Sequence, residues 1–197
     1  MIRGTWPRPH RVADDDRERW DARHRAAGAA GAPSGPVPPD LLRGREDLLP
    51  AGGRALDVAC GRGGVAVWLA ARGFVVDAVD VSEVALAAGA ATAERHGVGE
   101  RVRWWAHDLD AGLPAGCVGP YEAVVCQRFR DPALYPALSA LLAPGGLLVL
   151  TVLSEVDEEP GRFRAPRGEL RAAFGGLTVL DHRERDGEAV LLARRPC

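Results

Sequence analysis

The feature that most constrains the fold is a regular alternation of apolar, strand-like runs with helix-like segments, which begins at Arg54. Branched aliphatic residues dominate the short runs RALDVA, FVVDAVD, YEAVVCQ and LLVLTVL. The segments between these runs are rich in alanine and end at glycine or proline. Such alternation predicts βαβ units, and hence a mostly parallel sheet with helices on both faces. Because LLVLTVL is apolar throughout, we expect that strand to be covered on both sides.

The last two strand-like runs form a different unit. LTVLDHRER and EAVLLARR flank Asp186-Gly187, a pair that favours a tight hairpin turn. A hairpin reverses the chain direction, so one of its strands must lie antiparallel to the others. Counting RVRWWAHD, the sequence predicts an α/β protein with a three-layer, Rossmann-like sheet. That sheet is seven-stranded and mostly parallel, and it closes with an antiparallel C-terminal strand.

The chain ahead of this core reads as two further parts. Residues 1–13 contain two prolines and scattered arginines, and we expect them to be mobile. Residues 14–50 form an N-terminal helical segment: DDDRERWDARHRAAG predicts a helix, a connector rich in proline and glycine follows, and DLLRGREDLL predicts a second short helix. Residues 51–197 then form a single folded domain without internal repeats.

Charge and cysteine usage limit the partners and the compartment. The formal net charge is −2 and every basic residue other than histidine is arginine, so the chain offers no strong field for nucleic acid or membrane. The four cysteines show no metal-ligand spacing, and no metal site is predicted. The longest apolar segment is broken by Pro144-Gly145-Gly146, and the N-terminus lacks the apolar core of a secretory signal. We expect a soluble, cytoplasmic monomer or homodimer.

The stretch LDVACGRGG points to a ligand site, because an apolar run ends on Asp57 and turns within a few residues into glycines. Gly61 and Gly63 let backbone amides approach a ligand, and the next helix presents its positive end. Gly61-x-Gly63-x-x-Ala66 satisfies the relaxed dinucleotide fingerprint, but Asp57 argues against a diphosphate. Two like charges ~5 Å apart at an effective dielectric of ~20 repel by on the order of 3 kcal/mol. The same carboxylate suits the ammonium and sulfonium groups of S-adenosylmethionine.

Asp57-Val58-Ala59-Cys60-Gly61-Arg62-Gly63 resembles the first motif of class I S-adenosylmethionine-dependent methyltransferases, an acidic residue followed by x-x-x-Gly-x-Gly. Asp80 ends the second strand, where the resemblance implies that it binds both ribose hydroxyls while Val81 packs on the adenine. Asp108 follows the third strand, and the resemblance implies a contact with the adenine amino group, with Leu109 beside it. Asp110 could take the place of Asp108. The resemblance covers roughly residues 54–153.

Two further segments extend the resemblance. Cys126-Gln127-Arg128-Phe129 follows the fourth strand, where cofactor and substrate meet in this family, and LLAPGGLLVL is similar to its turn into the fifth strand. RERWDARHRAAG resembles small-molecule methyltransferases of the tellurite-resistance type, in which an N-terminal helical segment lies over the cofactor. Trp20 and His24 match that family's Trp-x-x-x-aromatic pattern, although His24 replaces the more usual tyrosine. Gly64 stands where relatives often carry arginine.

The resemblance and the arginine- and phenylalanine-bearing loops together predict two sets of site residues. The expected cofactor-binding residues are Asp57, Ala59, Cys60, Gly61, Gly63, Asp80, Val81, Asp108, Leu109, Gln127 and Trp20. The expected substrate-binding residues are Arg128, Phe129, Phe163 and His24. The arginines near Arg128 and Phe163 have an alternative interpretation as solvated side chains of an arginine-rich protein. No group of residues is identified as catalytic.

These residues predict transfer of a methyl group from S-adenosylmethionine to a small-molecule acceptor. The reaction is an in-line displacement, promoted mainly by proximity and orientation, with Arg128 orienting the acceptor. Nucleic-acid amino-methyltransferases carry Asp/Asn-Pro-Pro-aromatic after the fourth strand, and this chain does not. Two alternatives stay open: an NAD(P)-dependent oxidoreductase, and a protein that binds S-adenosylmethionine without catalysis.

Overall fold

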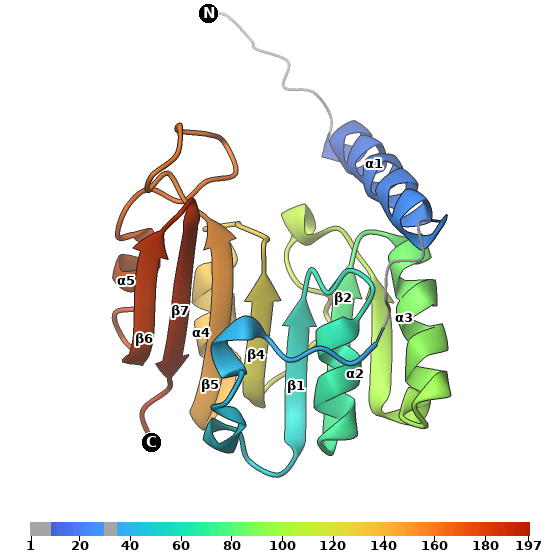
Figure 1. Ribbon diagram of the computed structural model, residues 1–197, viewed down its shortest axis with the longest axis horizontal. Helices are drawn as coiled ribbons and strands as arrows, with labels where there is room; N and C mark the ends of the chain where they lie inside the picture. The colour runs from blue at the N-terminus through green and yellow to red at the C-terminus, as the bar shows by residue number, and fades with distance from the viewer. Residues whose placement is uncertain (1–8, 30–34) are drawn as a thin grey trace, which may run out of the picture.

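The computed structural model describes residues 9–29 and 35–197, and the side chains of residues 9–15 and 29 are left out of the description. The first helix, α1, spans Pro9–Ala29 and so begins before the predicted start at Asp14. Of residues 1–13, which the sequence predicts to be mobile, residues 1–8 lie outside the described residues and residues 9–13 belong to α1. In Figure 1, α1 lies above the rest of the molecule, beyond the carboxyl ends of the parallel strands.

A seven-stranded sheet forms the centre of the molecule, with the strand order β3-β2-β1-β4-β5-β7-β6. The strands are β1 (Gly53–Val58), β2 (Phe74–Asp80), β3 (Val102–Ala106), β4 (Tyr121–Gln127), β5 (Leu142–Leu153), β6 (Thr178–Arg185) and β7 (Glu188–Arg194). The first five pair in parallel, and β7 pairs antiparallel with both β5 and β6. The predicted α/β sheet with its closing hairpin is therefore confirmed.

Helices cover both faces of this sheet, as Figure 1 shows. On one face lie α2 (Gly64–Ala71) and α3 (Glu83–Arg95), and on the other lie α4 (Tyr135–Ala140) and α5 (Glu169–Ala173). The strand order reverses between β1 and β4, and in open sheets of this kind a crevice opens at that point beyond the carboxyl ends. No helix in the described ranges is long and apolar enough to cross a membrane.

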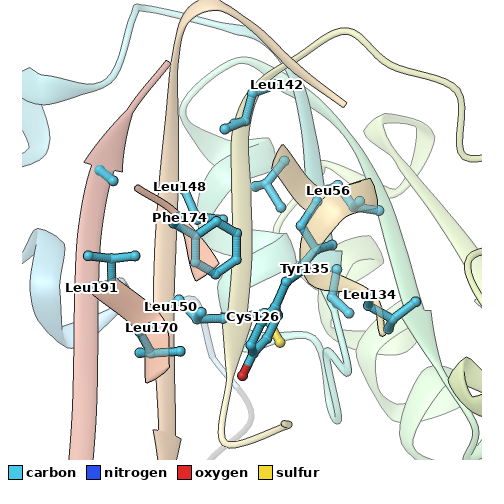
Figure 2. Packing of buried hydrophobic residues seen from close by; sticks show 14 of the residues in the cluster. Leu56, Cys126, Leu134, Tyr135, Leu142, Leu148, Leu150, Leu170, Phe174 and Leu191 are labelled. Carbon is cyan, nitrogen blue, oxygen red and sulfur yellow. The ribbon is translucent and has the colours of Figure 1, made fainter. Parts of the chain in front are cut away.

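The apolar core is divided by the sheet into two layers. Figure 2 shows the layer beneath α4 and α5, where Leu148 and Leu150 of β5 lie close to Phe174. The rings of Tyr135 and Phe174 lie 5.1 Å apart in a tilted arrangement. Residues 147–150 of β5 are fully buried, which confirms that this strand is covered on both faces. The rigid centre therefore fixes the carboxyl ends of β1, β4 and β5, where the site lies.

Two local predictions were wrong in detail. Residues 40–49 form two 3₁₀ turns, Asp40–Leu42 and Glu46–Leu48, rather than one helix, because Gly44 between them has a φ of +71°. The helix expected from Pro132 begins only at Tyr135 and ends at Ala140. It ends early because Leu142 already pairs with Tyr121, which makes the Pro144-Gly145 segment an irregular start of β5 rather than a helix end.

Candidate functional site

A cavity of about 510 Å³ lies at the carboxyl ends of the strands, under α1. Its wall combines one face of α1 with the residues that follow β1, β2, β3 and β4. The lining residues are Asp16, Trp20, Arg23, His24, Ala59, Gly61, Asp80, Val81, Asp108, Leu109, Asp110, Gln127, Arg128, Phe129 and Leu153. The cavity therefore gathers residues from distant parts of the sequence at the point where the strand order reverses.

The loop after β1 makes a tight turn that forms part of the cavity wall. Ala59 and Gly61 both have a φ of +53°, which is unfavourable for alanine and accessible to glycine. The Cys60 amide donates to the Val79 carbonyl at 2.9 Å, so the turn is fastened to β2. A Cβ atom at Gly61 would lie 3.7 Å from the His24 ring, which places this glycine directly opposite α1. Strained backbone that persists at a cavity wall is typical of a ligand site.

Asp80, the last residue of β2, is held in a fixed position by two backbone amides. Its Oδ2 accepts from the Gly61 amide at 2.8 Å, and its Oδ1 accepts from the Ser82 amide at 2.9 Å. The residue is only 8% exposed, yet it lines the cavity. An ionised carboxylate has about four acceptor positions. Asp80 therefore keeps acceptor capacity for a pair of hydroxyl donors.

Helix α1 is attached to the core through one carboxylate. The Asp21 Oδ1 accepts from the Ser82 hydroxyl at 2.5 Å and lies 3.4 Å from the donating amide of Val84. Both donors belong to the first turn of α3, so Asp21 adds a second acceptor to the helix end that Ser82 already caps. This attachment places the neighbouring Trp20 and His24 over the cavity, with their ring centroids 6.0 Å apart.

Carboxyl groups outnumber cations in the cavity wall. Asp16, Asp80, Asp108 and Asp110 line it, against the guanidinium groups of Arg23 and Arg128. Burial raises the pKa of Asp110, and the charges of Asp108, Asp131 and Asp16 raise that pKa further. Burial also lowers the pKa of His24, so its imidazole is neutral at pH 7. The potential in the cavity is therefore negative, which favours a cationic ligand over an anionic one.

The profile of the methyltransferase-domain family matches residues 55–146, which include the glycine loop, Asp80 and Asp108. Residues 55–146 thus carry a methyltransferase domain of the class I, S-adenosylmethionine-dependent type. TehB from Haemophilus influenzae shares the fold, with a TM-score of 0.67 at 20% identity over 79% of this chain and 61% of TehB.

Curated relatives differ in what they methylate. The ribosomal RNA small subunit methyltransferase C of Chromohalobacter salexigens is 38% identical over 157 residues, covering 74% of this chain and 43% of that protein. The ubiquinone biosynthesis O-methyltransferase of Psychrobacter cryohalolentis is 32% identical over 135 residues, covering 66% of this chain and 49% of that protein. The chain thus spans less than half the length of these two relatives.

The cofactor of this methyltransferase family is S-adenosylmethionine, and the residues that line the cavity fit it. The cofactor carries a sulfonium and an ammonium group against one carboxylate, so its net positive charge matches the excess of carboxyl groups. A nicotinamide dinucleotide would instead place two negatively charged phosphates beside these carboxyl groups. Each phosphate charge ~5 Å from a carboxylate costs on the order of 3 kcal/mol at an effective dielectric of ~20.

Most residues that the sequence predicted for the methyltransferase site line the cavity. They are Trp20, His24, Ala59, Gly61, Asp80, Val81, Asp108, Leu109, Gln127, Arg128 and Phe129. Four predicted residues lie outside the wall, namely Asp57, Cys60, Gly63 and Phe163. The individual binding roles of all of these residues remain predictions, since placement in a wall does not assign a ligand atom to a side chain.

Asp57 lies beneath the glycine loop rather than in the cavity wall. It is 3% exposed, and its Oδ2 has no hydrogen-bond partner among the described residues. Burial raises the pKa of Asp57 to about 8, and the nearby charge of Asp80 raises it as well, whereas a hydrogen bond from the Ala66 amide opposes the shift. In this conformation the carboxyl is therefore neutral at pH 7, unlike the anion that the sequence suggested.

Gly63 is a glycine for a packing reason. A Cβ atom there would lie 2.4 Å from the Trp104 ring, and one at Gly89 would lie 2.6 Å from the same ring. The Trp104 indole of β3 therefore lies between the loop and α3, where only glycine leaves room. The sequence pattern identified the residue, but its requirement comes from this aromatic side chain and from its φ of +68°.

Of the arginines in the loops after β4 and β5, only Arg128 lines the cavity. Arg130 forms two hydrogen bonds with Glu169, one of them from Nε at 2.8 Å, and so joins the β4–α4 loop to α5. Arg164 donates to the Ser154 carbonyl at 2.8 Å. Phe163 is 58% exposed, with the Arg162 guanidinium 5.3 Å from its ring centroid. These side chains hold loops together rather than form a shared anion-binding face.

The sequence analysis missed three wall residues, and a helical-periodicity signal could have found two of them. Asp16 and Arg23 lie on the same face of α1 as Trp20 and His24, because residues spaced by three, four and seven positions align along a helix. Arg23 also lies over the Trp20 ring at 5.1 Å. Leu153 ends β5, and its position at a carboxyl end is the same signal that identified Gln127.

Proposed function

We propose that this protein transfers the methyl group of S-adenosylmethionine to a small-molecule acceptor. The observation that carries the proposal is the cavity itself, in which four carboxyl groups face two guanidinium groups under a helix attached to the core. A cationic donor gains from this field, whereas a diphosphate cofactor is repelled. The negative wall therefore supports the methyl donor over the nicotinamide alternative.

Each wall residue supports a distinct part of donor binding. Asp80 is buried, fixed by two amides and left with acceptor capacity, which suits a ribose diol. Asp108 accepts from the Asp110 amide at 3.0 Å, and this turn holds both carboxyl groups in the cavity wall, where they could accept from an amino group. Arg23 supplies a guanidinium over Trp20, which suits a carboxylate. Together these contacts would orient the reactive carbon toward Gln127 and Arg128.

The residues after β4 would then hold the acceptor. When bound, S-adenosylmethionine supplies a methyl carbon whose bond to sulfur breaks, with the electron pair left on sulfur, as an acceptor lone pair forms the new bond. Phe129 and Leu153 offer an apolar surface beside Arg128. The neutral imidazole of His24 can take up the proton that an oxygen or nitrogen acceptor releases. Orientation between these groups supplies about 7–11 kcal/mol in favourable systems.

Arg130 and Arg164, in the loops after β4 and β5, are engaged by the protein itself, which favours a small-molecule acceptor over RNA. RNA binding depends on basic side chains that are free to neutralise phosphates. Around the cavity mouth, Arg130 is paired with Glu169, and Arg164 is bonded to carbonyl groups and lies 3.6 Å from Glu158. The net charge of −2 adds no general attraction to nucleic acid. A non-catalytic binding role has no specific observation in its favour.

The compartment is inferred from the thiols. Cys60, Cys117, Cys126 and Cys197 are all free. Free cysteines without disulfides are typical of reducing compartments. This supports a cytoplasmic location, which fractionation of the source cells would test directly.

Calorimetry with three ligands tests the donor. We expect S-adenosylmethionine and S-adenosylhomocysteine to bind and NAD⁺ not to bind, because only the last brings a diphosphate into the acidic wall. The variant Asp80→Asn should weaken binding of both adenosyl ligands. Tight binding of NAD⁺ without binding of either adenosyl ligand would refute the proposal.

The acceptor class is tested by labelling. The enzyme is incubated with methyl-labelled S-adenosylmethionine and either total ribosomal RNA, ribosomal protein or the low-molecular-weight fraction of a cell extract. Label should appear in the small-molecule fraction, and Arg128→Ala should lower kcat/KM for the labelled compound. Label confined to RNA or ribosomal protein would overturn the small-molecule assignment while leaving methyl transfer intact.

A further inference from the structure

A second cavity, of about 690 Å³, lies beside the first at the same edge of the sheet. The segment before β1 forms one side of it, and the ends of β5, β6 and β7 form the other. Its lining residues are Val37, Pro38, Asp40, Leu41, Arg43, Gln127, Arg128, Thr151, Arg183, Arg185, Asp186, Glu188 and Val190. Only Gln127 and Arg128 line both cavities, so these residues form the wall between them.

The shared wall is held by an unusual backbone conformation. Arg128 has a φ of +59°, which is unfavourable for a residue with a side chain, and its amide donates to the Thr151 carbonyl at 2.7 Å. This hydrogen bond continues the pairing of β4 with β5 by one residue beyond the strand end. The side chain of Arg128 is thereby placed at the junction, where its guanidinium is 75% exposed.

Arginines dominate the second cavity, and their ion pairs are weak. Arg128 lies 3.2 Å from Glu188, and Arg185 lies 3.8 Å from Asp186. The side chains are mostly exposed except that of Glu188, which is 40% exposed. Exposed pairs of this kind contribute about 0–1 kcal/mol, so a ligand anion can replace the protein carboxylate at little cost. The cations of this cavity are therefore available to a bound molecule.

Arg183 provides the surplus positive charge. Its Nε lies 3.5 Å from Asp181, but the other oxygen of that carboxylate already accepts from Arg45 at 2.8 Å. One carboxylate thus serves two guanidinium groups. Of the residues that line the cavity, four are arginines and three are acidic, which leaves a net positive charge. This is the opposite of the first cavity, where carboxyl groups are in excess.

We propose that the second cavity binds the methyl acceptor, and that the acceptor is a polar organic molecule with a carboxylate or phosphate group. The inference rests on the proposed methyl transfer, because it assigns the acceptor side of that same site. Arg183 and Arg185 hold the anionic group, and the nucleophilic end of the molecule reaches past Gln127 and Arg128 to the donor. The two cavities thus separate a cationic donor from an anionic acceptor by charge.

The test is an NMR titration of the full chain saturated with S-adenosylhomocysteine. The probes are citrate, inorganic phosphate and, as an uncharged control, glycerol, all at constant ionic strength. We expect citrate, phosphate or both to shift the amides of Leu41, Thr151 and Val190 in a saturable manner, with glycerol inactive. The tighter of the two anions identifies the group that the site prefers.

Two variants and a matched control make the test specific. Arg183→Ala and Arg185→Ala should each raise the Kd of the anion by about fivefold, the usual effect of losing one charge-assisted contact. Arg171→Ala, which removes an exposed arginine on α5, should not change it. Unchanged affinity for S-adenosylhomocysteine shows that the variants are folded.

The outcomes separate the two proposals. If S-adenosylhomocysteine binds but neither anion binds saturably, the acceptor assignment is overturned and methyl transfer stands. The acceptor assignment also fails if Arg171→Ala weakens anion binding as much as Arg183→Ala does, because the effect is then one of general charge. If S-adenosylhomocysteine itself fails to bind, the proposed function fails first.

Discussion

Two aspartates lie buried on neighbouring strands of the same sheet, but they differ in their hydrogen-bond partners and in the layer of the core that they face. Asp77 on β2 is 1% exposed and accepts from three side chains: Tyr121 at 2.8 Å, Arg54 at 3.1 Å and Trp105 at 3.0 Å. Asp57 on β1 is 3% exposed, and its Oδ2 accepts from none of the described residues. The two carboxyl groups face opposite layers of the core, because Asp77 is level with Leu56 in the register.

This difference distinguishes a carboxylate that stabilises the fold from one whose free acceptor capacity can respond to a ligand. Asp77 has a cation and two neutral donors, so it joins three strands without an unpaired charge. Asp57 has no cation beside it, and the pKa of about 8 that burial imposes keeps it neutral at pH 7. A buried carboxyl with spare acceptor capacity, directly under the glycine loop, can change its ionisation when a cation binds above it.

The largest effect should come from removing the charge of Asp77. Asp77→Asn leaves the guanidinium of Arg54, which is 35% exposed, without its partner in a mostly buried position. We expect the free energy of unfolding at pH 6 to fall by about 3 kcal/mol, as for other broken buried pairs. Urea denaturation followed by circular dichroism measures it. The matched variant Asp57→Asn should cost close to nothing at that pH, and equal losses from both would erase the distinction.

A second prediction concerns the reason why position 63 must be glycine. Gly63→Ala should lower the free energy of unfolding by about 2–3 kcal/mol, because a Cβ would meet the Trp104 ring at 2.4 Å. Gly97→Ala is the matched control, since Gly97 has a φ of +69° and nothing within 4 Å. It should lose only about 1 kcal/mol from strain. Equal losses would show that backbone strain alone, and not the tryptophan, requires glycine at position 63.

The pH dependence of stability should report Asp57 directly. Its pKa is raised from 3.8 to about 8 in the folded state, so above pH 4 the folded chain binds one more proton than the unfolded chain. Stability contributed by this group is therefore present at low pH and lost as pH rises from about 4 to about 8. We expect stability to fall by up to about 1.4 kcal/mol for each pH unit in this window, a slope that should be absent from Asp57→Asn. Identical pH profiles for the two proteins would contradict the raised pKa.

The smallest effect on stability should come from the carboxylate that attaches α1. Asp21→Asn weakens the acceptor of the Ser82 hydroxyl and should cost about 0.5–1 kcal/mol, the usual value of a helix cap. Its effect on the Kd of S-adenosylmethionine should be larger, about fivefold, because Trp20 and His24 lose their position. Calorimetry measures both values, with the exposed Glu18→Gln as control. A change in stability without a change in Kd would show that α1 does not cover the donor.

The strand–helix alternation predicted the architecture because each run was long and strongly apolar. FVVDAVD and LLVLTVL became β2 and part of β5 with nearly the expected bounds. Predictions failed where competing contacts decided the backbone. Pro132 predicted a helix that runs to Pro144, but the helix ends at Ala140 because Leu142 already pairs with Tyr121. Helix propensity over six residues is too weak to resist such pairing.

The site was predictable in position but not in chemistry. Asp80, Asp108 and Gln127 follow strands whose carboxyl ends meet at one edge, and this placement follows from the parallel sheet alone. Asp57 does not line the cavity, and burial raises its pKa to about 8. The sequence could not show this, because it gives a residue's type and strand but not its surroundings. Arg23 was overlooked, although its spacing from Trp20 places it on the helix face that lines the cavity.

By itself, the sequence determined the sheet, the edge at which ligands bind and the family, since these follow from local periodicity and from residues within one loop. Tertiary structure alone decided which of two buried aspartates is surrounded by side-chain donors, because Arg54, Tyr121 and Trp105 come from other strands. It also decided that Gly63 makes room for Trp104. Solvation and steric exclusion depend on distances between residues far apart in the chain, and only the folded molecule sets those distances.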